Sequence, residues 1–341
     1  MGDTIAWKPK SNDANVASVR YRCLIPLEAL KQKGMSVELF DEKKVDNYKA
    51  VIFSKLYDKK NQDVAYRVHE AGGIVILDLC DNHFYNPFEL DAYNHVKINL
   101  LKMISIADKI VCSTKTLAEV VKEEAGLDVM PVVIGDPVEN IADVDVTGWK
   151  KKLSKRLIDL IEFKKRDLPY LLWYGSHGAP NAPSGMEDIL KIESVLCEAY
   201  EKYPFELVVV SNSKKKFDDK ISVLNIPVRY VEWDQNKFNE LLVSARAVII
   251  PININPFTVC KTNNRLALAL SCKVPVVADL IPSYEEFSDY CYLDNWKYGL
   301  EMVLRNDTSV MDKVRAGHKY LKENWMIDNV VSDWELFLKE V

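Results

Sequence analysis

Short runs of almost continuous apolar residues recur along this chain and constrain its fold more than any other feature. The runs are rich in β-branched residues and do not alternate between apolar and polar positions. They lie at residues 50–54, 73–80, 109–113, 130–135, 169–175, 205–211, 247–251 and 274–279. Because they have no polar face to turn toward water, such runs are typical of strands that are buried on both faces of a parallel sheet.

Helical patterns alternate with these runs. Three S/T-x-x-E capping boxes mark expected helix starts, namely Thr116 with Glu119, Ser184 with Glu187, and Ser283 with Glu286. Strands that alternate with helices throughout predict an α/β fold with doubly wound sheets.

The chain has 341 residues, which is too long for one ordinary core, so we expect two domains. The alternation breaks once, at the charged stretch 136–168. We therefore predict a first Rossmann-like domain at 1–140, a linker at 141–168, a second Rossmann-like domain at 169–318, and terminal helices at 319–341 that pack back on the first domain. This organisation implies a cleft between the two domains.

Charge and cysteine usage restrict the partners of the chain. A net charge of -5 argues against a dedicated nucleic-acid binder. The seven cysteines are scattered, without a C-x-x-C pair or zinc-ligand spacing, which predicts a reducing, cytoplasmic compartment and no metal site. No apolar stretch reaches the length of a membrane span. The basic amphipathic stretch 149–166 is a candidate for peripheral contact with the inner membrane face, and a helix packed on a neighbouring domain is the alternative.

The stretch "CKTNNRLALALSC" places polar and cationic groups at the start of an apolar helix. If the helix begins near Thr262 to Asn264, its free N–H groups lie beside Lys261 and Arg265, and Asn263 adds a further polar side chain. This combination suits the phosphates of a nucleotide. A solvated helix end capped by asparagine is the alternative.

Two loops that follow predicted strands add candidates for the same ligand. In "YGSHGAPN", Gly175 and Gly178 flank Ser176 and His177, and glycine lets a backbone approach a ligand closely. The loop has neither the G-x-G-x-x-G nor the Walker pattern, and a turn that needs glycine for shape alone is the alternative. Trp233 lies between a predicted strand and helix, where it can receive a nucleotide base or pack against the fold.

In their order, these segments resemble GT-B glycosyltransferases. The likeness rests on "YGS", "SNS", "VEW", "AVIIPIN" and "KTNNRLALALSCKVPVVAD" in the second half, and on "NVASVRYRCLIPLEALKQKG", "ADKIVCSTKTLAEVV" and "VIGDPVE" in the first. It covers nearly the whole chain and implies two Rossmann-like domains that hold a nucleotide sugar in the cleft. Retaining members similar to glycogen synthase carry two glutamates before "G-x-P-V-V-A". Cys260 and Leu268 stand at those positions here, so retention or inversion stays open.

The first half supplies candidates for the acceptor side. Asp81 and His83 follow a predicted strand in "LDLCDNHFYNP", and Asp13 lies in the first loop. Each could take the proton of an acceptor hydroxyl, and a packing or hydrogen-bonding role is the alternative. Arg20 and Arg22, in "SVRYRC", are candidates to bind a phosphate or carboxylate on the acceptor, with surface ion pairs as the alternative.

We therefore expect a glycosyltransferase that moves a sugar from a nucleotide-sugar donor to the hydroxyl of a glycan or lipid-linked acceptor, in cell-surface polysaccharide or glycoconjugate synthesis. Lys261 and Arg265 would stabilise the departing phosphate, so no cofactor or metal ion is expected. A sugar-nucleotide epimerase and a non-catalytic nucleotide-sugar-binding subunit are the alternatives. The donor nucleotide, the sugar and the acceptor stay open.

Overall fold

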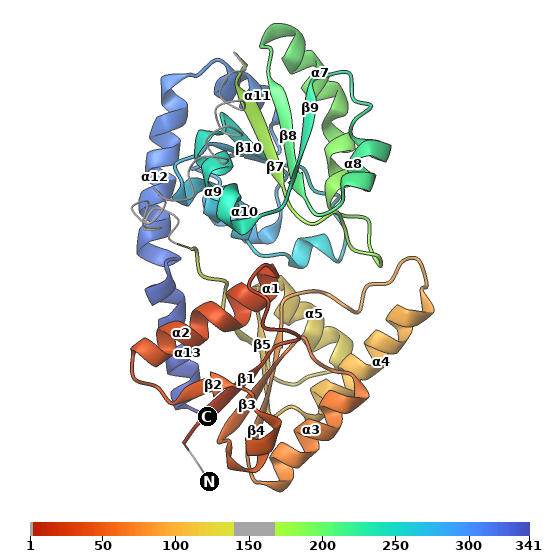
Figure 1. Cartoon of the computed structure of the whole chain (residues 1–341), viewed down its shortest axis with the longest axis vertical. Helices are drawn as coiled ribbons and strands as arrows, with labels where there is room; N and C mark the ends of the chain where they lie inside the picture. The colour runs from red at the N-terminus through yellow and green to blue at the C-terminus, as the bar shows by residue number, and fades with distance from the viewer. Residues whose placement is uncertain (1–2, 140–167) are drawn as a thin grey trace.

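Two α/β domains lie one above the other in the computed structural model of the chain (Figure 1). The structure describes residues 3–139 and 168–341. The expected linker at 141–168 and the basic stretch at 149–166 therefore lie, apart from residue 168, outside the described residues.

The first domain is built on a six-stranded parallel sheet with the order β2-β1-β3-β4-β5-β6. Its strands are β1 (Ile5–Lys8), β2 (Val37–Leu39), β3 (Ala50–Ser54), β4 (Ile74–Leu79), β5 (Lys109–Cys112) and β6 (Val132–Val133). Its helices are α1 (Ala17–Val19), the π-helical turn η1 (Arg20–Leu24), α2 (Ile25–Gln32), the 3₁₀ helix η2 (Glu42–Asn47), α3 (Lys59–Glu70), α4 (Asp91–Ile106) and α5 (Lys115–Ala125).

Alternate residues of these strands enter two separate cores, one on each face of the sheet. Ile5 and Ile52 pack in the core beneath α2, whereas Ala6 and Val51 pack in the core beneath α3, α4 and α5. Successive side chains of a strand point to opposite faces, so apolar residues at consecutive positions produce a sheet that is covered on both sides.

The second domain has a second six-stranded parallel sheet with the order β12-β11-β10-β7-β8-β9. Its strands are β7 (Tyr170–Tyr174), β8 (Glu206–Ser211), β9 (Val228–Glu232), β10 (Ala247–Ile250), β11 (Val276–Ala278) and β12 (Tyr292–Leu293). Its helices are η5 (Met186–Ile192), α7 (Glu193–Lys202), α8 (Lys214–Lys220), α9 (Gln235–Ser244), η6 (Thr258–Cys260), α10 (Asn264–Ser271), η7 (Pro282–Phe287), α11 (Trp296–Leu304), α12 (Thr308–Asn324) and α13 (Ile327–Lys339). The expected α/β class with two Rossmann-like domains is confirmed.

The three capping boxes are wrong in detail, although a helix follows each. Helix α5 begins two residues earlier than expected, because Thr114 rather than Thr116 accepts a hydrogen bond from the first turn. At η5 the N-cap is Gly185, whose N–H donates to Asp188. No side chain caps η7, which begins with Pro282. A local S/T-x-x-E pattern does not fix which residue leaves the helical conformation first.

Helix α12 crosses from the second domain toward the first, and α13 packs against α2 (Figure 1). Helix α12 spans the expected bound at 319 between the second domain and the terminal helices. On α13, Trp334 enters the first-domain core and meets Trp7 edge-on, with 4.8 Å between the ring centroids. The end of the first domain lies beside the end of α12, since the N–H of Val138 donates to the carbonyl of Trp325 at 2.8 Å.

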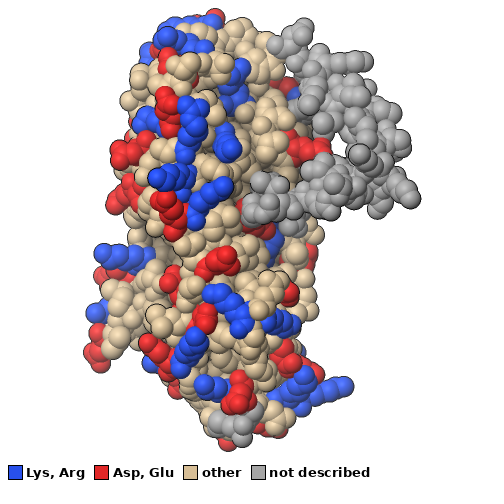
Figure 2. All heavy atoms as spheres, turned by 90° about the vertical axis from the view of Figure 1, so that its left-hand side faces the viewer, with Lys and Arg blue, Asp and Glu red and all other residues tan. Residues whose placement is uncertain are grey.

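The face that carries α12 and α13 shows basic and acidic side chains mixed over its whole visible length (Figure 2). Ion pairs such as Lys33 with Glu335, at 3.0 Å, and Lys339 with Glu335, at 2.6 Å, contribute to this pattern. Both link exposed or half-exposed side chains, so each stabilises the fold only slightly.

Candidate active site

The carboxyl ends of the two sheets face each other. Lys261, which follows β10, pairs with Asp81, which follows β4. Asn82 Nδ2 donates to the carbonyl of Pro256 at 2.9 Å, and Thr114 Oγ1 donates to the carbonyl of Cys260 at 3.0 Å. Strand order reverses between β1 and β3 and between β7 and β10, and ligands of open α/β sheets bind beyond the carboxyl ends at such points.

Helix α10 begins at Asn264, as expected. The alternative, a solvated helix end capped by an asparagine side chain, does not hold. Asn263 occupies the N-cap position, is 2% exposed, and makes no side-chain capping bond. Among the described residues its Oδ1 has no hydrogen-bond partner. The first turn of α10 therefore lacks a side-chain cap, and its positive end is free to meet an anion.

Arg265 lies against the glycine-bearing loop that follows β7. A Cβ atom added to Gly175 would lie 3.4 Å from Arg265 Nη1. Tyr174 Oη donates to the carbonyl of Arg265 at 2.6 Å, and Ser211 Oγ donates to the carbonyl of Gly175 at 2.8 Å. The structure thus brings together the two segments that the sequence analysis assigned to the nucleotide.

The second glycine of the loop has a different role. Gly178 has φ of +143°, and a Cβ atom there would lie 2.6 Å from the carbonyl oxygen of Ser184. It is required for the shape of the loop, which was the alternative reading. Between the glycines, Ser176 and His177 are exposed, and His177 Nδ1 lies 2.9 Å from Asn212 Oδ1.

Trp233 is half-buried at the end of β9. Its ring lies 4.8 Å from that of Phe238, tilted by 44°, and Phe238 in turn lies 4.6 Å from Tyr174. The N–H of Trp233 donates to the carbonyl of Ser211 at 2.8 Å. These contacts hold the indole at the same edge of the sheet as Gly175. Thr262 is half-buried, directly before the N-cap of α10.

On the first domain, Asp81 is shared by two lysines. Lys55 contacts one carboxylate oxygen and Lys261 of the second domain contacts the other. Burial opposes ionisation of Asp81, but Lys261 and Lys55 outweigh it and hold the pKa of Asp81 well below its usual range. Asp81 therefore stays a carboxylate at neutral pH and is a weak base.

His83 lies beside Asp81 and contacts Tyr57 through its Nδ1. Burial lowers the pKa of His83 to about 4, and the neighbouring cations Lys55 and Lys261 act in the same direction, while Asp81 opposes them. The imidazole is neutral at pH 7 and can accept or donate a hydrogen bond there.

The remaining acceptor-side candidates are placed elsewhere. Asp13 is exposed in the loop after β1, and its carboxylate accepts from Asn15. Arg20 is 7% exposed and is bound to Glu139 at 2.7 Å and to the carbonyl of Ala14 at 2.6 Å. Both arginines of "SVRYRC" lie in the π-helical turn η1, where the helix widens.

Arg22 has no exposed surface, which corrects its assignment as an acceptor-binding residue. Its guanidinium lies 2.5 Å from Asp78 and 3.0 Å from Asp136, and it donates to the carbonyls of Ile134 and Gly135 at 2.6 and 3.0 Å. These partners and its complete burial keep the side chain from reaching a ligand. Arg22 does form ion pairs, as in the alternative, but these pairs are buried rather than at the surface.

Sequence reasoning missed Lys55 and Tyr57 in this region. Both directly follow β3, in "AVIFSKLY", so the rule that ligand-binding residues follow the strands of a parallel sheet points to them. It also missed Asp136, whose Oδ2 accepts from Asn264 of the second domain at 2.7 Å. That contact depends on how the two sheets dock, and no local pattern encodes it.

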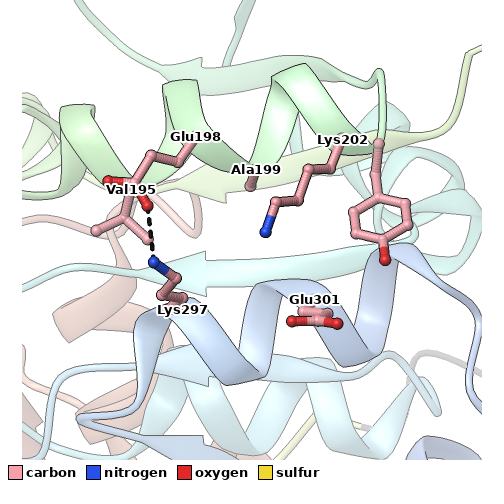
Figure 3. A pocket seen from close by; sticks show the side chains of 7 residues that line it. Val195, Glu198, Ala199, Lys202, Lys297 and Glu301 are labelled. Carbon is pink, nitrogen blue, oxygen red and sulfur yellow. Dashed lines mark hydrogen bonds and ion pairs between the residues drawn. The ribbon is translucent and has the colours of Figure 1, made fainter.

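Two hollows in the described residues lie away from these groups. One, between α7 and α11, has about 20 Å³, holds about one water molecule, and carries the ion pair of Lys297 with Glu198 at 3.1 Å (Figure 3). The other has about 330 Å³ and lies at the amino ends of β7, β10 and β11, beside Pro169, Arg246 and Pro275. Both are remote from the carboxyl edge of the sheet, where ligands of this fold class bind.

Among the described helices, none has both the length and the hydropathy that a bilayer span requires. Within residues 3–139 and 168–341, no group of three or more His, Cys, Asp or Glu side chains is placed to hold a metal ion.

Comparison with solved structures shows the fold. HepE of Anabaena, solved with UDP, has a TM-score of 0.67 and 12% identity over 99% of this chain and 100% of HepE. A glycosyltransferase of Rickettsia africae has a TM-score of 0.66 and 13% identity over 99% of this chain and 98% of that one. TarM has a TM-score of 0.59 and 12% identity over 86% of this chain and 55% of TarM. No protein-family model and no curated protein sequence matches the chain.

These similarities confirm the resemblance drawn from the sequence. The chain has the GT-B fold of glycosyltransferases, with two Rossmann-like domains.

Proposed function

We propose that this chain is a glycosyltransferase that moves a sugar from a UDP-sugar to an acceptor hydroxyl. One observation carries the proposal: Arg265 lies against Gly175 at the strand-order reversal of the second sheet, beside Lys261 and the N-terminus of α10, which lacks a side-chain cap. A guanidinium and a helix N-terminus suit a diphosphate, and Lys261, three residues before α10, adds a cation that in this structure pairs with Asp81 of the first domain.

The choice of uridine is supported by the structural neighbours. HepE was solved with UDP, with UDP-glucose, and with UDP and glucose. In this chain Trp233 lies at the same edge of the sheet as Gly175, where an aromatic ring can pack against a base.

The proposed chemistry uses charges that the protein already holds in place. Bond cleavage at the sugar leaves negative charge on the departing diphosphate. Lys261, Arg265 and the α10 N-terminus stabilise that charge, so the protein's own groups supply the electrostatic assistance to the leaving group. Closure of the two domains over the donor would keep water from it.

The acceptor hydroxyl approaches from the first domain in this proposal. Asp81, as a carboxylate, and His83, as a neutral imidazole, can each accept a hydrogen bond from it. Asp13 is a more exposed candidate for the same task. We further propose a glycan or lipid-linked acceptor in cell-surface polysaccharide or glycoconjugate synthesis. All seven cysteines are free thiols, which supports a cytoplasmic location.

Nucleotide binding tests the donor site. We expect UDP to raise the melting temperature more than GDP, ADP or CMP, because a bound ligand stabilises the folded state. Lys261→Ala and Arg265→Ala should each weaken UDP binding about 10- to 100-fold, since hydrogen bonds to charged groups contribute about 1.5–3 kcal/mol. Lys297→Ala and Arg305→Ala remove exposed cations of the same domain and are the matched controls. Unchanged UDP affinity in folded Lys261→Ala and Arg265→Ala proteins would contradict the site.

Turnover tests the reaction. UDP-sugars are incubated with and without acceptor extracts, and the products are separated by chromatography. Transfer of the sugar to an acceptor supports the proposal. Release of an epimerised sugar without a transfer product indicates an epimerase, and binding without any turnover indicates a non-catalytic subunit.

A further inference from the structure

The start of α10, where the diphosphate of the donor is proposed to bind, is contacted in this structure by two carboxylates of the first domain. The Asp81 carboxylate contacts the Lys261 ammonium, and Asp136 Oδ2 accepts a hydrogen bond from Asn264 Nδ2 at 2.7 Å. Lys261 lies three residues before the helix, and Asn264 is its first residue. Carboxylates of the protein thus bind two polar groups that lie where the phosphates are expected.

The two carboxylates differ in how firmly they are held. The Asp136 side chain is 5% exposed and is bound by Arg22 at 3.0 Å, so it belongs to a buried cluster. The Asp81 side chain is 14% exposed, and its other carboxylate oxygen contacts Lys55. The pKa of Asp81 lies well below its usual range, so Asp81 is an anion at neutral pH. Asp81 is therefore the carboxylate that a ligand can replace as the partner of Lys261.

The backbone before Lys261 is fixed to the first domain. Cys260 has no exposed surface and packs in a first-domain core, and its carbonyl accepts from Thr114 Oγ1 at 3.0 Å. The Lys261 side chain, by contrast, is 36% exposed, and its Nζ lies 3.9 Å from the centroid of the Phe257 ring. A lysine has a flexible four-carbon stem and three rotatable donors. Rotation of the side chain alone can therefore move the ammonium from one anion to another.

We propose that Asp81 is an internal competitor of the donor's diphosphate, which holds Lys261 until the nucleotide displaces it. Only molecules in which Lys261 has left Asp81 offer the full cationic site, so the apparent affinity for the nucleotide is reduced by the fraction of such molecules. The same competition helps UDP to leave after transfer, because Asp81 binds the ammonium again. The inference rests on the proposed function and adds how its donor site is regulated.

Isothermal titration calorimetry with UDP, inorganic pyrophosphate and uridine tests this competition. Asp81→Asn keeps the shape of the side chain and removes its charge, so we expect UDP and pyrophosphate to bind about fivefold more tightly or better. Uridine carries no phosphate, so its affinity should not change. Asp63→Asn is the matched control, because it removes an exposed first-domain carboxylate that pairs with Lys59 at 2.7 Å. Its affinity for UDP should equal that of the parent protein.

Removal of Lys261 separates competition from general repulsion between Asp81 and the diphosphate. In the Lys261→Ala protein there is no ammonium to release, so the further change Asp81→Asn should leave the affinity for UDP unchanged. A gain from Asp81→Asn that persists in the Lys261→Ala protein overturns the proposal, since the carboxylate then acts only by repulsion. A gain for uridine equal to that for UDP also overturns it, since the effect is then not one on phosphate binding.

A second variant keeps the test decisive if Asp81→Asn does not fold, which circular dichroism shows. Lys55→Met leaves Asp81 with Lys261 alone and no charge unpaired, so Asp81 should hold Lys261 more firmly and UDP should bind more weakly. This loss should disappear in the Lys261→Ala protein, and a loss that remains there overturns the proposal.

The parent protein separates this inference from the proposed function. If the parent binds UDP and folded Asp81→Asn binds it equally well, the competition is overturned and the donor site stands. If neither protein binds UDP, the proposed function itself fails.

Discussion

The buried guanidinium of Arg22 provides a stringent test of how the first domain is held together, because two carboxylates share it. The side chains of Arg22, Asp78 and Asp136 are 0%, 0% and 5% exposed. One cation and two carboxylates give this cluster a formal charge of minus one. Ser54 Oγ also donates to Asp78 at 2.8 Å, so the carboxylate that lies deeper has a second partner.

Replacing Arg22 by methionine keeps much of the volume but removes the cation. Two buried carboxylates then lose their counter-charge, and the carbonyls of Ile134 and Gly135 lose their donor. Breaking a buried pair from one side costs about 3–5 kcal/mol. We therefore expect Arg22→Met to lower the free energy of unfolding of the first domain by about 4 kcal/mol or more.

Asp78→Asn should be milder, although it changes the same ion pair. Arg22 keeps Asp136 as a counter-charge, so the formal charge of the cluster becomes zero and no charge is left unpaired. We expect a loss of about 1.5–3 kcal/mol, the contribution of hydrogen bonds to a charged group. The charge count thus predicts that removing the cation lowers the free energy of unfolding more than removing one of the two anions does.

Urea unfolding measures the difference. Trp334 lies 5.3 Å from the Arg22 guanidinium and packs against Trp7, so tryptophan fluorescence reports on this core. With an m-value of about 3 kcal/mol/M, Arg22→Met should lower the midpoint by about 1.3 M or more. Arg67→Met is the matched control, since Arg67 is 45% exposed and pairs only loosely with Glu42 at 3.4 Å. A midpoint for Arg22→Met equal to that of Arg67→Met, or a larger loss in Asp78→Asn, would refute the reasoning.

Two further predictions follow from single positions. A Cβ atom at Gly135 would lie 2.5 Å from the Trp325 ring, so Gly135→Ala should lower the melting temperature. Gly126 lies at a helix end with open space around it, so Gly126→Ala should destabilise the protein only through the strain of its φ of +62°. Equal losses of melting temperature in the two variants would contradict the packing argument. His83 has its pKa lowered to about 4, so the unfolded chain binds its proton more readily, and stability should fall as the pH drops from about 6.5 to about 4, by at most about 1.4 kcal/mol per pH unit. Comparison of His83→Gln with the parent protein across this range checks the sign, and parallel pH profiles for the two proteins would exclude the lowered pKa.

Strand positions could be predicted because the information is local. Each of the eight apolar runs contains a strand, whereas β1, β2, β9 and β12 lie outside them. The start of α10 could also be predicted, since a polar stretch before an apolar helix marks an N-terminus wherever the helix packs. The cap residues of α5 and η5 could not, because several polar residues compete for one position and packing decides between them.

The sequence by itself determined the α/β class, the two parallel sheets and the cationic start of α10, since these depend on which residues lie next to each other in the chain. The tertiary structure decided which charges remain free for a ligand. Arg22 and Arg20 look alike in "SVRYRC", yet the first has no exposed surface and the second binds Glu139. Lys55, Asp81 and Lys261 lie far apart in sequence and meet only because the carboxyl ends of two sheets face each other. Coulomb interactions depend on distance in space and on burial, and both are set by the docking of the domains rather than by any local pattern.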